Sequence, residues 1–276
     1  MPINESNTNE THWAETFYVN HSYLYLPLLE NLKKDVYPEV EGLCKLFKEF
    51  KIPRGSKILD LSCGIGRHSI PLAKEGYEIV GYDPSQFFLE KAMLYSEQEL
   101  VKEKKKIKFY KGITSELQDV LYSNNEINFN AIIIMFNSFG YIDEAEDIRI
   151  LKQLHSIAET GCILVIETEN RDWTIMNTPH HYIWELDGIL SNEIWEFDQS
   201  ISTAHSRSKF YKKDPNEECF RLQLELQTKL RLYSMHELKS LLSNAGWSFL
   251  KSYGNIRTLE NVSLKSQYIV TISKKI

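Results

Sequence analysis

The amino-acid sequence predicts an α/β protein with a mostly parallel β-sheet and, late in the chain, an inserted antiparallel β subdomain. Strand-like and helix-like patterns alternate as far as residue 170, which is typical of chains that build a parallel sheet. From residue 182 to residue 233, strand patterns follow one another without a convincing helix. One more helix and two closing strands complete the chain, and we expect the last strand to run antiparallel in the main sheet.

The most informative segment begins at Lys57 and ends at Ser85. Its patterns predict a buried strand, a helix and a second strand, at residues 58–61, 67–74 and 78–82. Gly64 and Gly66 lie between the first strand and the helix, where glycine lets the backbone turn tightly and approach a ligand. Asp83 stands at the carboxyl end of the second strand, where a carboxylate can accept hydrogen bonds from ribose hydroxyls. The segment therefore predicts a nucleotide-binding βαβ unit.

Other elements of the first 170 residues follow from similar patterns. We expect the first ten residues to be disordered, whereas residues 12–32 are dense in aromatic side chains. Apolar residues at helical spacing predict further helices, at residues 36–50, after Ser85, and at 143–158. Apolar runs predict further strands, at residues 107–110, 129–136 and 162–167. The basic run at residues 102–108 is interpreted as a solvated helix end and turn rather than as a phosphate site.

The late segment shows the period of β-strands most clearly at residues 221–233. Five leucines fall on one parity there, with charged or amide groups on the other: Leu222, Leu224, Leu226, Leu230 and Leu232. This alternation predicts a strand with one buried face and one solvated face. Partner strands are expected at residues 189–197 and 203–211, with a hairpin turn at 214–216. A helix at 235–244 and strands at 247–253 and 267–273 are expected to complete the main sheet.

The composition favours a soluble enzyme and disfavours several other classes of protein. The chain has 276 residues, of which 42% are hydrophobic and 25% are charged, so it can bury a sizeable core. It contains no apolar run of about 18 residues and begins without an apolar signal region, so no membrane span is expected. Its four cysteines are scattered without metal-binding spacing, which favours a cytoplasmic location and no metal site. The net charge of −6 disfavours a nucleic-acid partner.

Asp60 indicates which nucleotide cofactor the loop holds. It ends the first strand immediately before the glycines. A carboxylate there would repel a dinucleotide pyrophosphate, but it suits the ammonium and sulfonium of S-adenosylmethionine (SAM). The segment resembles motif I and the following acidic motif of class I SAM-dependent methyltransferases, in which Asp60, Gly64, Gly66 and Asp83 match. Ser62 stands where the family's first glycine is usual.

The resemblance extends over residues 12–275 and implies a Rossmann-like class I methyltransferase sheet. It points to the small-molecule type, which carries an antiparallel β insert between strand five and the last helix. The implied organisation has four parts: an N-terminal segment with lid helices (1–50), a SAM-binding Rossmann-like core (51–177), the insert (178–233) and a C-terminal completion of the core (234–276). The insert is expected to cover or shape the acceptor pocket.

The resemblance also implies which residues bind SAM and its product, S-adenosylhomocysteine. The backbone from Ser62 to Gly66 and Asp60 would hold the methionine part, and Asp83 the ribose. Ile113 stands where an acid for the adenine amino group is usual. The full set of expected cofactor residues is Tyr18, Asp60, Ser62, Cys63, Gly64, Gly66, Asp83, Pro84, Ser85, Gln86, Ile113, Thr114, Phe136 and Asn137.

The catalytic residues are unknown from the sequence, because a sulfonium methyl is already activated. The protein must hold a nucleophile in line and exclude water, and it needs a general base only if the acceptor is protonated. The candidates are Glu167, His180 and His181; surface or internally bonded histidines are the commoner case. Glu169 and Arg171 also stand near the carboxyl end of the fifth strand. Tyr18, Tyr23 and Tyr25 either form a lid or belong to a helix packed on the sheet.

The function that the sequence favours is methyl transfer from SAM to an oxygen or nitrogen of a small-molecule acceptor. Alternatives are an RNA or protein methyltransferase, an NAD(P)-binding oxidoreductase, and a SAM-binding protein without catalysis. The sequence Met135 to Ser138 is not the Asp-Pro-Pro-Tyr type that methylates DNA bases, which again disfavours nucleic acid. A monomer or a homodimer is expected.

Overall fold

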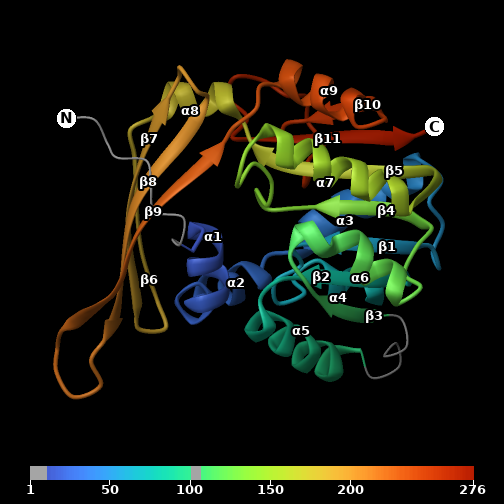
Figure 1. Cartoon of the computed structure of the whole chain (residues 1–276). Coiled ribbons are helices and arrows are strands. Elements are labelled where there is room, and N and C mark those ends of the chain that lie inside the picture. The colour runs from blue at the N-terminus through green and yellow to red at the C-terminus, as the bar shows by residue number, and fades with distance from the viewer. Residues whose placement is uncertain (1–10, 101–106) are drawn as a thin grey trace.

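The computed structural model describes residues 11–100 and 107–276, and it contains two β-sheets (Figure 1). The main sheet has seven strands in the order β10-β11-β5-β4-β1-β2-β3, and the second has four in the order β6-β7-β8-β9. The expectation of disorder for the first ten residues lies outside the described residues. So does most of the basic run; its last two residues begin β3, where Lys108 pairs with Glu126.

The main sheet is parallel except for one strand, as predicted. Its strands are β1 (Lys57–Leu61), β2 (Glu78–Asp83), β3 (Ile107–Lys111), β4 (Phe129–Ile134), β5 (Ala158–Glu169), β10 (Trp247–Tyr253) and β11 (Tyr268–Lys275). β11 pairs antiparallel with both β5 and β10, while the other pairs are parallel. Their apolar runs fit this position, because strands of a parallel sheet are buried on both faces.

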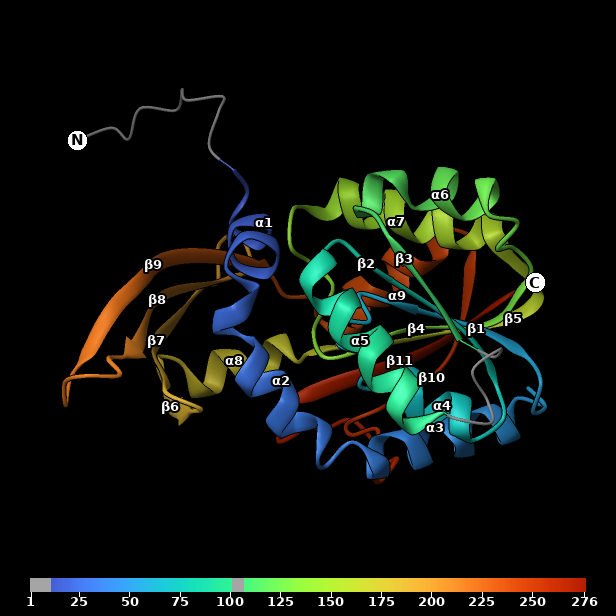
Figure 2. The same ribbon diagram turned by 90° about the horizontal axis from the view of Figure 1, so that it is seen from below.

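Helices cover both faces of this sheet (Figure 2). One face packs against α3 (Tyr37–Glu49) and α4 (Ser69–Lys74), with α5 (Gln86–Glu99) beside them. The other packs against α6 (Leu117–Ser123), α7 (Glu144–Ile157) and α9 (Met235–Asn244). α5, α7 and α9 begin at capping side chains, respectively Ser85, Asp143 and Ser234. The carboxyl ends of the parallel strands are thus left open toward the second sheet.

The second sheet is an antiparallel meander that stands beside that open edge (Figure 1). It consists of β6 (His180–Leu186), β7 (Ile189–Asp198), β8 (Thr203–Lys213) and β9 (Phe220–Arg231), and it follows a short helix, α8 (Arg171–Asn177). The insert and three of its strands were predicted. The strand β6 and the helices α6 and α8 were not, and the domain boundaries stay a prediction.

The N-terminal segment fills the space between the two sheets (Figures 1 and 2). It runs through α1 (Trp13–Glu15), a π-helical turn (Thr16–Asn20), a 3-10 turn (Ser22–Leu24) and α2 (Leu26–Lys33). Phe17 and Leu24 pack against Phe210 of the insert, whereas Leu29 packs against Ile65 of the glycine loop. Tyr23 is exposed, so the segment resembles a wedge between two bodies more than a helix laid on the sheet.

The predicted leucine face of β9 is correct for its second half only. Leu226, Leu230 and Leu232 are buried, but Leu222 is 51% exposed. The register between β8 and β9 shifts at this point: Phe210 lies opposite Leu224, and the next residue, Tyr211, lies opposite Leu222. An extra residue in one strand reverses which face the following side chains occupy, so simple parity fails across the shift.

Three element boundaries differ from the expected ones for local reasons. β4 ends at Ile134 rather than at residue 136, because Phe136 and Asn137 adopt left-handed backbone angles (φ 55° and 60°). β5 begins at Ala158, where a helix was expected to continue, and Gly161 lies inside it with φ 91°. The helix after the glycine loop begins at Ser69, two residues later than expected. Within residues 11–100 and 107–276, no helix combines the length and apolar character that a membrane crossing requires.

Candidate active site

Three cavities meet where the two sheets face each other. The loop cavity, of about 110 Å³, lies at the glycine loop; the side cavity, of about 270 Å³, lies beyond Pro84; the insert cavity, of about 460 Å³, lies against the second sheet. Tyr18 and Tyr141 line all three cavities, and their rings stack with centroids 5.9 Å apart. The three cavities are therefore neighbours, with two tyrosines where they adjoin.

The glycine loop of the loop cavity is held by Asp83. One carboxylate oxygen, Oδ2, accepts a hydrogen bond from the Gly64 N–H at 2.9 Å, and the other, Oδ1, accepts from the Ser85 N–H at 2.9 Å. Gly64 and Gly66 have φ of 54° and 76°, which glycine adopts without strain. Burial raises the pKa of Asp83 to about 6. Asp83 thus fixes the loop and faces the cavity, in addition to its expected role toward a ribose.

Asp60 lies beneath the same cavity and is almost completely buried. Its Oδ2 accepts a hydrogen bond from the Ser69 hydroxyl at 2.5 Å. Burial raises the pKa of Asp60 to about 7, against the opposing effects of Ser69 and Arg67. A positively charged group placed in the cavity would favour the ionised carboxylate.

We expect the change Asp60→Asn to stabilise the ligand-free protein at pH 8. Because the pKa of Asp60 is raised on folding, its contribution is neutral below about pH 4 and becomes unfavourable as the pH rises to 7. The amide removes that penalty, which the shift puts on the order of 2–4 kcal/mol at pH 8. Urea denaturation without ligand checks it. The difference between variant and wild type should shrink to about 1 kcal/mol near pH 4.5. Equal free energies of unfolding at pH 8 would contradict the expectation.

Arg67 adds a buried cation to the loop cavity. It is 4% exposed, and its Nη1 donates to Glu39 Oε2 at 2.7 Å. Its guanidinium lies 4.9 Å from the centre of the Phe136 ring. Its Nη2 is buried and has no hydrogen-bond partner among the described residues. A buried donor without a partner is costly, so this atom marks a place where an anionic or carbonyl oxygen would bind.

A small polar network around Glu39 holds the Arg67 side chain in place. Burial and the neighbouring Arg67 lower the pKa of His68 to about 4, so its neutral ring donates Nε2–H to Glu39 at 2.8 Å. Burial alone would raise the pKa of Glu39, but its hydrogen bonds and the nearby cations lower it to about 2. Arg257 donates to the other oxygen of Glu39 at 2.7 Å. Glu39 therefore stays ionised and holds the Arg67 side chain in place.

The loop after β4 forms the wall between the loop cavity and the insert cavity. Phe136 lines both cavities. Its N–H donates to Glu167 Oε2 at 3.2 Å, and the Asn137 side-chain oxygen accepts from the Glu169 N–H at 2.9 Å. Gly140 accepts from the Arg231 N–H at 2.8 Å, which ties the wall to the end of β9.

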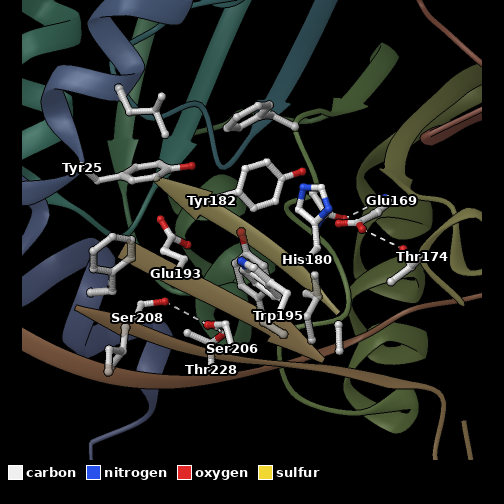
Figure 3. A pocket seen from close by; sticks show the side chains of 18 of the residues that line it. Tyr25, Glu169, Thr174, His180, Tyr182, Glu193, Trp195, Ser206, Ser208 and Thr228 are labelled. Atoms are coloured by element: carbon white, nitrogen blue, oxygen red, sulfur yellow. Dashed lines mark hydrogen bonds between the residues drawn. The ribbon is translucent and has the colours of Figure 1, made fainter. Parts of the chain in front are cut away.

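The insert cavity is enclosed mainly by aromatic side chains (Figure 3). Two carboxylates, Glu169 and Glu193, belong to its lining. Burial raises the pKa of Glu169. The floor of the insert cavity carries small side chains, among them Ser206 and Ser208, where larger apolar residues would fill the space. The cavity therefore exists because one face of β8 is small and polar.

The three catalytic candidates lie in different places. His180 lines the insert cavity, and its ring centre lies 4.1 Å from that of Tyr182. His181 lies on the opposite face of β6, exposed and bonded to Asn192, so the structure does not bring it to the site. Glu167 is buried behind Phe136 and lines none of the three cavities; burial raises its pKa to about 7.

Most of the expected cofactor residues line one of the three adjoining cavities. The loop cavity is lined by Tyr18, Asp60, Ser62, Cys63, Gly64, Asp83, Pro84 and Phe136, the side cavity also by Ile113 and Thr114, and the insert cavity also by Asn137. Gly66, Ser85 and Gln86 line none of them. Gly66 packs against Ile70, Ser85 caps α5, and Gln86 bonds to Glu90 on the exposed side of that helix.

Several residues of the site were missed by the sequence-based prediction. Arg67 looked like part of a helix, and Tyr141 lies in an irregular loop without a pattern. Glu193 stands in a strand whose inward face could not be assigned. The alternation Ala204, Ser206, Ser208 along β8 is a usable signal, since small polar residues on a buried face leave room for a ligand.

The loop cavity fits the amino-acid end of SAM. A carboxylate at Asp60 suits its ammonium and sulfonium, and the unpartnered Arg67 Nη2 suits its carboxylate. The left-handed Gly64 lets the backbone pass close to the cavity without a Cβ. The adjoining side cavity offers apolar walls beyond Pro84 and Ile113.

Comparisons with known proteins place this geometry in a family. A family model described as a methyltransferase domain matches residues 36–252. Glycine N-methyltransferase of Mus musculus is 29% identical over 130 residues, which are 43% of this chain and 42% of that protein, so this chain spans less than half of its length. A SAM-dependent methyltransferase of Clostridium acetobutylicum superimposes with a TM-score of 0.71 at 16% identity, covering 92% of this chain and 97% of that one. The sugar N-methyltransferase KedS8 of Streptoalloteichus has a TM-score of 0.64 at 16% identity, with 99% of both chains covered.

Proposed function

The chain belongs to the methyltransferase-domain family, as a class I, SAM-dependent methyltransferase, and on that premise we propose that it methylates a nitrogen or oxygen atom of a small molecule. The acceptor's lone pair forms the new bond to the methyl carbon, and the electron pair of the broken S–C bond stays on sulfur. SAM supplies the activated methyl group.

The observation that carries this proposal is that two cavities adjoin. The loop cavity, which fits the amino-acid end of SAM, shares Tyr18, Tyr25, Phe136 and Tyr141 with the insert cavity. An acceptor bound in the insert cavity would thus meet the cofactor at its reactive end, shielded from water by aromatic rings. Asp60, Asp83 and Arg67 would hold the cofactor, while the insert would hold the acceptor.

The size and chemistry of the insert cavity support a small-molecule acceptor. Its volume of about 460 Å³ lies within the usual range for small-ligand sites. None of the described residues that line it is Lys or Arg, whereas nucleic-acid sites rely on such cations. KedS8, which shares the fold over nearly the whole chain, is named as a sugar N-methyltransferase. These features favour a small molecule over RNA or protein.

Calorimetry and a transfer assay test the proposal. S-adenosylhomocysteine should bind and NADH should not, because of the carboxylates at Asp60 and Asp83. Tritiated SAM incubated with a metabolite extract should label a low-molecular-weight product. Binding of NADH in place of S-adenosylhomocysteine would overturn the cofactor assignment. Label found in macromolecules alone would overturn the small-molecule acceptor.

We expect the change Ser206→Phe to lower turnover at least tenfold while leaving S-adenosylhomocysteine binding within twofold of the wild type. Ser206 is buried on the inner face of β8, between Trp195 and Thr228 of the neighbouring strands. A phenyl ring there would occupy the insert cavity without reaching the loop cavity. The matched control is Arg207→Phe, which places the same ring on the exposed face of the same strand. If Ser206→Phe loses cofactor binding together with turnover, the assignment of the cofactor to the loop cavity and the acceptor to the insert cavity is contradicted.

A further inference from the structure

The lining of the insert cavity contains two carboxylates, Glu169 and Glu193, and one histidine, His180. None of its described lining residues is Lys or Arg. Aromatic rings supply much of the remaining wall, among them Tyr25, Tyr182, Trp184 and Trp195. Carboxylates and aromatic faces together attract a cation and repel an anion.

Each of the two carboxylates has one oxygen held and one oxygen unbound. Glu193 Oε1 accepts from the Ser191 hydroxyl at 2.6 Å and from Trp184 Nε1 at 3.4 Å. Glu169 Oε1 accepts from the Thr174 hydroxyl at 2.7 Å. The second oxygen of each side chain has no hydrogen-bond partner among the described residues, and Figure 3 shows Glu193 pointing into the cavity. The held oxygens fix both side chains while the other two can bind a ligand.

The positions of the carboxylates suit different tasks. Glu169 ends β5 and is tied through its backbone N–H to Asn137, next to the wall that separates the two cavities. It therefore lies on the side of the insert cavity that faces the cofactor. Glu193 lies on β7, opposite Ser208, and so belongs to the sheet that forms the floor. Burial raises the pKa of Glu169, which makes its carboxylate a better proton acceptor.

A cluster of hydroxyls lies beside Glu193 on the same floor (Figure 3). Ser206 Oγ lies 3.1 Å from Ser208 Oγ and 2.7 Å from Thr228 Oγ1, and all three side chains are buried. Two contacts use at most two of the three hydroxyl hydrogens, so a donor and several lone pairs stay available. Such a cluster can bind hydroxyl groups of a ligand.

We infer that the acceptor is a protonated amine that also carries hydroxyl groups. Glu193 and the aromatic rings hold the ammonium, and the cluster of Ser206, Ser208 and Thr228 binds the hydroxyls. One proton then passes from the ammonium nitrogen to the unbound oxygen of Glu169, which becomes neutral while the nitrogen gains a free lone pair. The inference rests on the proposed function, since it names the acceptor class of the same site.

Calorimetry with matched pairs of small probes tests the inference. The full-length protein, saturated with S-adenosylhomocysteine, is titrated at pH 7.5 with glucamine against sorbitol, with glucosamine against glucose, and with trans-2-aminocyclohexanol against trans-cyclohexane-1,2-diol. Gluconate provides an anionic counterpart. We expect at least one amine to bind ten times more tightly than its neutral partner, and gluconate to bind least. The absence of any preference for the cation in all three pairs would overturn the inference.

Two variants that each remove one negative charge distinguish an effect of the cavity carboxylate from an effect of the protein's net charge. Glu193→Gln should weaken the binding of the preferred amine at least tenfold and leave its neutral partner unchanged. Glu185→Gln removes the same charge from an exposed position on β6 and should change neither. Both variants should bind S-adenosylhomocysteine like the wild type. An amine affinity that Glu193→Gln leaves intact would overturn the role of Glu193 and with it the inference.

A further variant tests the role of Glu169. Glu169→Gln should bind the amine at pH 7.5 more weakly than the wild type, and its rate of methyl transfer from tritiated SAM to that amine should rise as the pH approaches the amine's own pKa, because the variant depends on amine that has already lost its proton. The wild-type rate should change little over the same pH range, and a variant with the wild-type pH profile would exclude Glu169 as the proton acceptor. Failure of the wild type to bind S-adenosylhomocysteine would instead reject the proposed function. Cofactor binding with equal affinity for charged and neutral probes would reject the acceptor class alone.

Discussion

The change Arg67→Met is expected to weaken S-adenosylhomocysteine binding by about thirtyfold or more. A charge-assisted hydrogen bond to a buried guanidinium contributes roughly 1.5–3 kcal/mol, which corresponds to about ten- to a hundredfold in affinity. Arg67 Nη2 is buried at the loop cavity and has no hydrogen-bond partner within residues 11–100 and 107–276, so binding of the ligand's carboxylate would satisfy it. Calorimetry on the purified variant measures the effect.

The matched control for this variant is Arg257→Met. Arg257 donates to Glu39 as Arg67 does, at 2.7 Å in both cases, but it is more exposed and lines none of the three cavities. Both variants remove one cation from the Glu39 network, and only Arg67→Met removes a donor from the cavity. If Arg257→Met weakens cofactor binding as much as Arg67→Met does, the effect comes from the network and not from direct binding.

The change Gly140→Ala is expected to destabilise the protein by about 3 kcal/mol or more. Gly140 has φ 86°, and an added Cβ would lie 2.2 Å from the carbonyl oxygen of Arg231, so the backbone must move. The left-handed angle itself costs about 1–3 kcal/mol for a side-chain-bearing residue, and overpacking adds a similar amount. Thermal denaturation should show a fall in Tm of about 6–12 °C for a chain of this length.

Gly55 offers a control with nearly the same φ angle. Its φ is 88°, and an added Cβ would meet no atom within 4 Å. Gly55→Ala therefore carries the conformational penalty without the collision. The difference between the two variants measures how strongly the wall at Gly140 is locked to the end of β9. If Gly140→Ala and Gly55→Ala lose the same stability, the backbone at Arg231 moves away from the new methyl group without cost.

Local patterns predicted the main sheet well, because parallel strands are long apolar runs and helices between them have periodic apolar faces. The antiparallel last strand followed from the family resemblance and is confirmed. β6 was missed because it carries polar and apolar side chains on both faces, such as His180 and Trp184 on one and His181 and Ile183 on the other. Its inward face lines the insert cavity instead of a packed core, so the usual alternation is absent.

The site was predictable where it depends on the glycine loop, and unpredictable where it depends on tertiary structure. Asp60, Gly64 and Asp83 are close in sequence, and their spacing alone places them together. Glu193 comes from a strand more than a hundred residues away. Its neighbours in the site are decided by the register of a meander whose pairing the sequence does not reveal. The face that His181 occupies was likewise undetermined until β6 was assigned.

The wedge formed by residues 13–33 has a consequence for how the chain folds. Phe17 and Leu24 of this segment are synthesised well before the strands against which they pack, which come from residues 189–226. Contacts so distant in sequence form late, after the loop entropy between them has been overcome. The main sheet can therefore begin to assemble during synthesis from elements that are close in sequence. The aromatic side chains of residues 13–33 stay exposed until the insert has been made. Limited proteolysis during refolding should therefore first detect species with a formed central sheet and an open insert cavity, cleaved within the N-terminal segment.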